Sequence, residues 1–64
     1  EEMLLTLEMF LNYNLNVSET AKKMYMHRNS LQYRIDKFMN ETGINIQNFD
    51  EALAVKLALI ARKS

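Results

Sequence analysis

The sequence predicts a small all-α domain built from four helices. The chain has 64 residues with no proline and one glycine, so few positions forbid a helix. Its apolar residues recur at steps of three and four, which is the spacing of a helix face, and no stretch alternates convincingly as a strand does. With 48% hydrophobic and 25% charged residues, the composition is that of a folded globular chain.

The first half of the chain predicts two helices. Residues 2–13 form the first, because apolar side chains fall on one face at helical steps: Leu4, Leu7, Phe10 and Leu11. Three asparagines and a serine follow in residues 12–18, and these residue types suit a helix end and a turn. Ser18 is therefore the predicted N-cap of a short second helix over residues 19–25.

The second half predicts two longer helices. The third covers residues 28–41, with several polar residues able to cap its start and Gly43 fitting a left-handed C-cap. The fourth covers residues 51–62, with Asp50 as its predicted cap. Basic residues at its end suit the negative end of the helix dipole.

The second and third helices, joined by a short link, have the spacing of a helix-turn-helix. The small Ala21 allows the two helices to cross closely, since a bulkier side chain would push them apart. Tyr25 lies where many such turns have glycine, so the backbone there either avoids the left-handed region or accepts strain. The residues predicted to pack this unit are Ala21, Met24, Met26, Leu31, Ile35 and Phe38.

The opposite face of the third helix is polar, with chemistry that suits a DNA major groove. Arg28 can pair with guanine, and Asn29 or Gln32 with adenine, each through two hydrogen bonds. The base-edge candidates are Arg28, Asn29, Ser30, Gln32 and Tyr33. The candidates for phosphate contacts, which set register rather than sequence, are Ser18, Lys22, Lys23, His27, Arg34 and Lys37.

Charge is distributed unevenly along a chain whose formal net charge is zero. Residues 1–20 carry four glutamates and no basic residue, whereas residues 21–37 carry five Lys and Arg against one aspartate. A neutral chain therefore has a basic middle segment, where the predicted helix-turn-helix lies.

The stretch "NVSETAKKMYMHRNSLQYRIDKFMNETGINI" resembles the C-terminal helix-turn-helix domain of PucR and CdaR-type bacterial transcriptional regulators. Its core "HRNSLQYRI" is close to that family's His-Arg-Asn-Thr-Leu-x-Tyr-Arg-Leu run, and a more distant similarity extends to Fis-type domains. The resemblance implies a double-stranded DNA-binding module at the C-terminal end of a longer cytoplasmic regulator, which is associated with the nucleoid through DNA and whose other domains sense a metabolite. The matching positions are His27, Arg28, Asn29, Ser30, Tyr33 and Arg34. Leu15 departs from a common family glycine, and Ser30 replaces threonine.

Several of the proposed DNA-contact residues also have a simpler structural interpretation. Arg34 and Lys37 can belong to a solvated surface with ion pairs to Asp36 and Glu41. Tyr33 can shield the helix crossing from water, and His27 suits a helix cap or a phosphate neighbour better than a metal ligand. The alternative function is a protein-interaction or dimerisation module without nucleic-acid contact.

The fourth helix is apolar on nearly all sides, with Lys56 the one polar residue in 52–61. Leu53, Leu57 and Ile60 are predicted to face the core, which leaves Val55 and Leu59 for a second surface. We therefore expect a homodimer on DNA, with the alternative that neighbouring elements cover the whole helix.

Several functions are disfavoured by composition. One histidine and no cysteine offer neither a nucleophile with a base nor the usual metal ligands, so no catalytic residue, metal site or cofactor is predicted. No apolar run reaches the 18 or so residues that span a bilayer, and the default location is the cytoplasm. The chain starts at Glu1 without methionine, so residues 1–64 are expected to be one domain of a longer protein.

Overall fold

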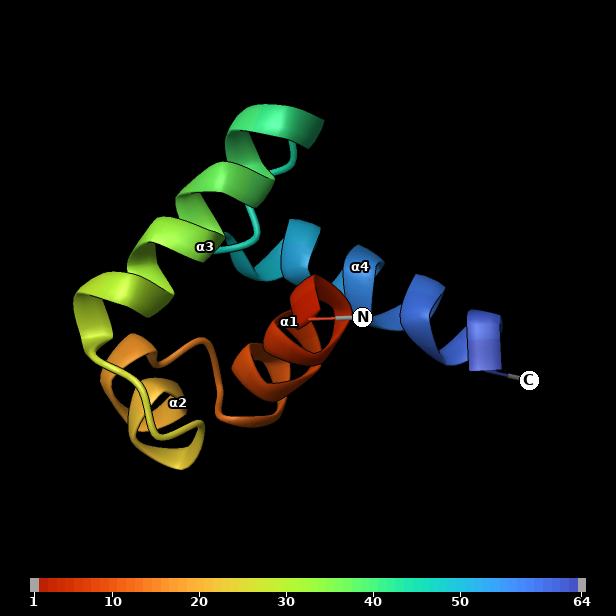
Figure 1. Cartoon of the computed structure of the whole chain (residues 1–64). Coiled ribbons are helices and arrows are strands. Elements are labelled where there is room, and N and C mark those ends of the chain that lie inside the picture. Colours follow the sequence, from red (N-terminus) through yellow and green to blue (C-terminus); the bar gives the residue numbers. More distant parts are fainter. Residues whose placement is uncertain (1, 64) are drawn as a thin grey trace.

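The computed structural model describes residues 2–63 and confirms an all-α domain of four helices (Figure 1). No strand occurs within those residues. Each predicted helix bound lies within two residues of the observed one, and the end residues 1 and 64 of the predicted domain lie outside the described part. The helices are α1 (Glu2–Asn12), α2 (Val17–Lys23), α3 (Arg28–Thr42) and α4 (Phe49–Lys63).

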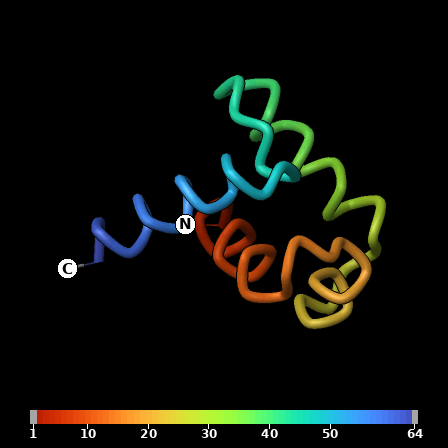
Figure 2. The backbone as a smooth tube through the Cα atoms, turned by 180° about the vertical axis from the view of Figure 1, so that it is seen from behind, coloured from red at the N-terminus to blue at the C-terminus, as the bar shows by residue number. Residues whose placement is uncertain are grey.

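Helix α1 lies at the centre of the arrangement and packs against each of the other three helices. Helices α2 and α3 pack against each other on one side of it, while α4 packs against α1. Figures 1 and 2 show that α4 runs away from α2 and α3 toward its C-terminal end. The molecule is therefore a compact helix-turn-helix with a projecting fourth helix.

All four helices and the α3–α4 link contribute side chains to one core. Ile46, in the link, is fully buried although it lies on no predicted helix face. Of the predicted face of α1, Leu7 and Phe10 are buried, and Leu4 and Leu11 are half-buried. The buried apolar residues are Leu7, Phe10, Ala21, Leu31, Ile35, Ile46 and Ala52.

Two predicted helix caps are wrong, because in each case an asparagine two residues earlier is the cap. The Asn16 side chain accepts a hydrogen bond from the Glu19 N–H at 2.9 Å, so Ser18 lies inside α2. The Asn48 side chain accepts from the Glu51 N–H at 3.2 Å, so Asp50 lies in the first turn of α4. The predicted left-handed C-cap at Gly43 is confirmed, with φ of 74°.

The α1–α2 link uses left-handed backbone at two consecutive residues, Asn14 and Leu15, with φ of 60° and 63°. The Leu15 N–H donates to the Phe10 carbonyl at 2.9 Å, which closes the end of α1. Leu15 adopts the conformation that a glycine would favour, and its half-buried side chain packs against the core.

The faces of α4 are the reverse of those predicted. Val55 and Leu59, expected on an outer surface, are half-buried against the core beside the buried Ala52. The residues expected in the core are exposed instead: Leu53, Leu57 and Ile60. Both sets recur at helical steps, so spacing alone does not distinguish them.

Candidate nucleic-acid interface

Helix α2 packs against α3, and Ala21 lies in the core cluster that the two helices share. Ala21 and Leu31 are both buried, and the small Ala21 side chain lets the two helices approach each other. The remaining residues predicted to pack this unit lie in or against the same core: Met24, Met26, Ile35 and Phe38. The position of α3 is therefore fixed by packing along its inner face.

The turn between α2 and α3 is a Schellman motif with tyrosine at the position that favours glycine. The Met26 N–H donates to the Ala21 carbonyl at 3.0 Å, and the Tyr25 N–H donates to the Lys22 carbonyl at 3.3 Å. Tyr25 has φ of 56°, so the backbone accepts left-handed strain. Its side chain is 97% exposed and contributes no packing that would offset this strain.

His27 caps the start of α3 and so determines which residues lie in its first turn. The His27 Nδ1 accepts a hydrogen bond from the Asn29 N–H at 3.0 Å. Arg28, Asn29 and Ser30 follow, and all three are exposed. Within residues 2–63, the side chains of Arg28 and Ser30 make no hydrogen bond or ion pair, so both are available to a ligand.

The two later base-edge candidates differ in availability. Tyr33 is 67% exposed, one helical turn after Asn29 on the same side of α3. Gln32 is half-buried, and its side-chain amide donates to Asp36 at 2.8 Å along the helix. Gln32 is therefore the least accessible of the five candidates.

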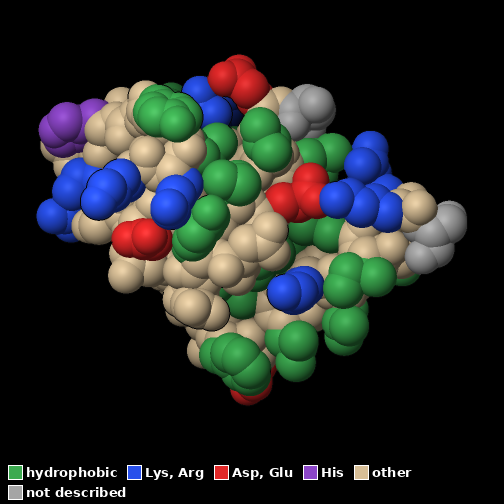
Figure 3. Space-filling model, turned by 90° about the horizontal axis from the view of Figure 1, so that it is seen from below, with side chains coloured by type: hydrophobic (Ala, Val, Ile, Leu, Met, Phe, Trp, Pro, Cys, Tyr) green, Lys and Arg blue, Asp and Glu red, His purple; other side chains and the backbone are tan. Residues whose placement is uncertain are grey.

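Most of the phosphate candidates surround the helix-turn-helix as exposed side chains. Lys22 and Lys23 lie in the last turn of α2, with the Lys23 Nζ 5.9 Å from the centroid of the Tyr13 ring. Ser18 is exposed in the first turn of α2, and Lys37 is exposed on α3. Figure 3 shows several Lys and Arg side chains grouped near the histidine, at the end of the molecule away from most of the apolar surface.

Arg34 differs from the other basic candidates because it is ion-paired within the molecule. Its Nη2 lies 2.9 Å from the Glu2 carboxylate, and its Nη1 donates to the Thr6 hydroxyl at 3.2 Å. The reading of Arg34 as an ion-paired surface residue is thus correct in kind, but Asp36 and Glu41 are not its partners. Sequence reasoning missed Glu2 and Thr6, since both lie on α1 about 30 residues away.

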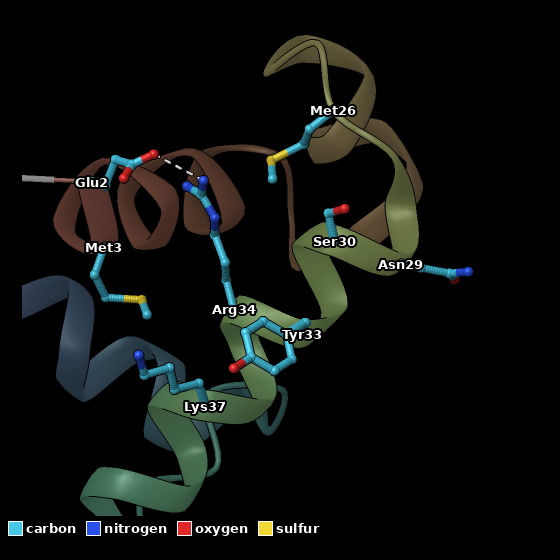
Figure 4. Close-up of a pocket in the computed structure, with 8 residues that line it drawn as sticks. All are labelled: Glu2, Met3, Met26, Asn29, Ser30, Tyr33, Arg34 and Lys37. Carbon is cyan, nitrogen blue, oxygen red and sulfur yellow. Dashed lines mark hydrogen bonds and ion pairs between the residues drawn. The ribbon is translucent and has the colours of Figure 1, made fainter.

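A groove of about 740 Å³ lies between the start of α1 and the outer side of α3 (Figure 4). Arg34 reaches from α3 toward Glu2, while Asn29 points away from the groove. The groove brings together three base-edge and two phosphate candidates with residues of α1. Its lining residues are Glu2, Met3, Met26, Asn29, Ser30, Tyr33, Arg34 and Lys37.

The described residues contain neither a candidate metal site nor a membrane-spanning helix. Across residues 2–63, no three His, Asp or Glu side chains lie together in a way that could hold a metal ion. None of the helices described there is long and apolar enough to cross a membrane.

Comparisons with known proteins place this arrangement among regulators. Residues 3–61 match the family model described as the PucR C-terminal helix-turn-helix domain. Over 98% of its own length, the chain is 44% identical to the uncharacterized protein YxkF of Bacillus subtilis. Over 84% of the chain, it is 35% identical to the carbohydrate diacid regulator of Escherichia coli. Over 92% of the chain, it is 34% identical to the purine catabolism regulatory protein of Bacillus subtilis.

The match covers only part of these relatives. The chain spans 21% of YxkF, 14% of the carbohydrate diacid regulator and 11% of the purine catabolism regulatory protein. No solved structure matches the chain.

Proposed function

The chain belongs to the family of PucR C-terminal helix-turn-helix domains, and we propose that it binds double-stranded DNA in a sequence-specific manner. It acts as the output domain of a longer cytoplasmic bacterial regulator, and any small-molecule effector binds another domain. The observation that carries the proposal is the first turn of α3. That turn presents Arg28, Asn29 and Ser30 to solvent, while Leu31 and Ile35 hold the helix against the core.

In this proposal α3 enters the major groove, with its first turn against the base edges. Arg28 pairs with the O6 and N7 of guanine, and Asn29 pairs with the N6 and N7 of adenine. Ser30 bonds to a base or a phosphate, and the Tyr33 ring packs on a sugar or a thymine methyl. Gln32 contributes less, because it is half-buried and already bonded to Asp36.

Phosphate contacts come from the residues around this reading turn. They set the register of the domain on the duplex and supply the salt-dependent part of the affinity. The N-terminal ends of α2 and α3 add partial positive charge, which favours phosphates near Ser18 and His27. The residues proposed to contact phosphates are Ser18, Lys22, Lys23, His27 and Lys37. Arg34 joins them once its ion pair with Glu2 is broken.

The relatives support a role in regulation. Two of them are named as regulators, one of carbohydrate diacids and one of purine catabolism. Their names concern those proteins, and the present chain shares with them only the helix-turn-helix segment.

A homodimer forms part of the proposal, since one recognition helix covers only a few base pairs and such proteins commonly bind two half-sites. The exposed apolar face of α4, formed by Phe49, Leu53, Leu57 and Ile60, replaces the predicted surface at Val55 and Leu59. In the dimer this α4 face packs against its copy in a second subunit. The same face also favours the alternative function, a protein-interaction module without nucleic-acid contact.

The deciding experiment selects bound duplexes from random DNA with the intact protein, and then titrates the enriched sequence and a scrambled one. We expect an enriched motif that binds about 1,000-fold or more tightly than scrambled DNA, as is typical of specific binding. Failure to bind any duplex at about 50 mM salt would reject the proposal and favour the interaction module.

A further inference from the structure

Glu2 occupies a position in the groove between α1 and α3 where the Arg34 guanidinium would attract a DNA phosphate. Its carboxylate accepts from the Arg34 Nη2 at 2.9 Å, directly beside the base-reading turn of α3. A carboxylate and a phosphate present similar oxygen pairs to a guanidinium, and both bind it strongly. We propose that this groove is a binding site for one phosphate of the DNA backbone, and that Glu2 occupies it until DNA displaces the carboxylate.

The geometry of Arg34 suits an exchange of one partner for another. Its Nη1 remains bonded to the Thr6 hydroxyl at 3.2 Å, and Thr6 is fully buried and itself donates to the Glu2 backbone carbonyl at 2.9 Å. The hydrogen bond to Thr6 therefore holds the guanidinium in place on its Nη1 side. Only the Nη2 has to change its partner, from the carboxylate to a phosphate oxygen.

Exposure and charge favour the exchange. The Glu2 side chain is 81% exposed and the Arg34 side chain 30% exposed, so the carboxylate can return to water while the guanidinium stays at the groove. Exposed ion pairs contribute little stability, whereas a neutralised phosphate releases a condensed counterion. Lys37 lines the same groove and makes no ion pair within residues 2–63, so it adds positive charge to the phosphate site.

The inference rests on the proposed DNA binding and predicts that Glu2 weakens it. We expect Glu2→Gln in the intact protein to bind random duplex DNA more tightly than the wild type at about 50 mM salt. Because Glu2 no longer competes with the phosphate for Arg34 and one negative charge leaves the groove, the advantage should be largest at low salt and should shrink as screening increases toward about 200 mM salt.

Glu8→Gln is the matched control. It removes the same charge from the same helix and also breaks an ion pair, the one with Lys63, but Glu8 does not line the groove. We expect it to change DNA binding much less than Glu2→Gln. In an Arg34→Gln background, Glu2→Gln should lose most of its effect, and thermal unfolding of each variant should show that the fold is retained.

Each contrary result has a distinct meaning. An equal gain from Glu8→Gln, or an undiminished gain in the Arg34→Gln background, would show a general charge effect and overturn the phosphate site. Unchanged or weaker binding by Glu2→Gln would also overturn it, while leaving the proposed function intact. If the wild type binds no duplex at low salt, the proposed function fails and the inference fails with it.

Discussion

Arg28 is the residue on which the proposed sequence readout depends most. Its side chain is exposed in the first turn of α3 and makes no ion pair within residues 2–63. We expect Arg28→Ala to weaken binding to the selected DNA sequence by about 1–3 kcal/mol and to relax discrimination at one base position. Titrations of the selected duplex and of its single-base variants measure both effects.

Lys22 provides the matched test of a phosphate contact. It is an exposed residue in the last turn of α2 and does not belong to the first turn of α3. Lys22→Ala should weaken binding to all duplexes alike and flatten the salt slope by about one, because a phosphate contact carries no base information. If neither this variant nor Arg28→Ala changes binding, the helix-turn-helix face has been wrongly assigned to DNA.

At the scale of single residues, the sequence predicted the exposed face of α3 but not the partners of its side chains. Helical periodicity separates Leu31 and Ile35 from the polar residues, and this requires only local spacing. The Arg34 contacts with Glu2 and Thr6 depend on how α1 crosses α3. That crossing is a tertiary feature which no local pattern encodes.

At the scale of elements, helix positions were predictable to within about a turn, whereas the N-caps of α2 and α4 were not. The α1–α2 link offers several capping side chains in close succession, and Asn16 and Ser18 have similar intrinsic preference for the cap. Burial of Thr20 and Ala21 fixes the register of α2, and this burial places Asn16 at the start of the helix. Local propensity therefore limits the cap to a few residues, and tertiary packing determines which of them is used.

Tyr25 gives the clearest test of an element-scale feature. It holds left-handed backbone at φ of 56° with an exposed side chain, so glycine should relieve the strain without loss of packing. After the greater entropy of glycine in the unfolded chain is subtracted, Tyr25→Gly should stabilise the domain by about 0.5–1 kcal/mol. Chemical denaturation measures the change in the free energy of unfolding.

Tyr25→Ala is the control for that substitution. It removes the ring but keeps the Cβ, and therefore keeps the backbone strain. We expect its free energy of unfolding to stay close to that of the wild type. Equal stabilisation by alanine and glycine would show that the ring, and not the backbone conformation, is responsible.

At the scale of the whole molecule, the sequence predicted a two-sided α4 but assigned its sides in reverse. Two stripes of the helix have equally good helical spacing, one through Ala52, Val55 and Leu59 and the other through Leu53 and Leu57. The choice between them depends on which stripe fits against α1. In the structure the stripe with the small Ala52 is the inner one, and Leu53 and Leu57 are exposed.

The exposed α4 face leads to a prediction about assembly. Leu57 is 59% exposed near the middle of the face, so Leu57→Lys should leave the fold intact and weaken a dimer that buries it. Sedimentation of the intact Leu57→Lys variant should show more monomer than the wild type does. Ala58→Lys adds the same charge at an exposed position on α4 outside the face, and should leave the dimer unchanged. A wild-type protein that is monomeric with and without DNA would contradict the dimer.

The projection of α4 from the body also has a consequence for local unfolding. Helix α4 packs on α1 and has one buried residue, Ala52, near its N-terminal end. Its later turns therefore have the least burial to resist opening, and their amide hydrogens should exchange with solvent faster than those of α3. Slower exchange in those turns at high protein concentration would reveal a helix whose order depends on its partner.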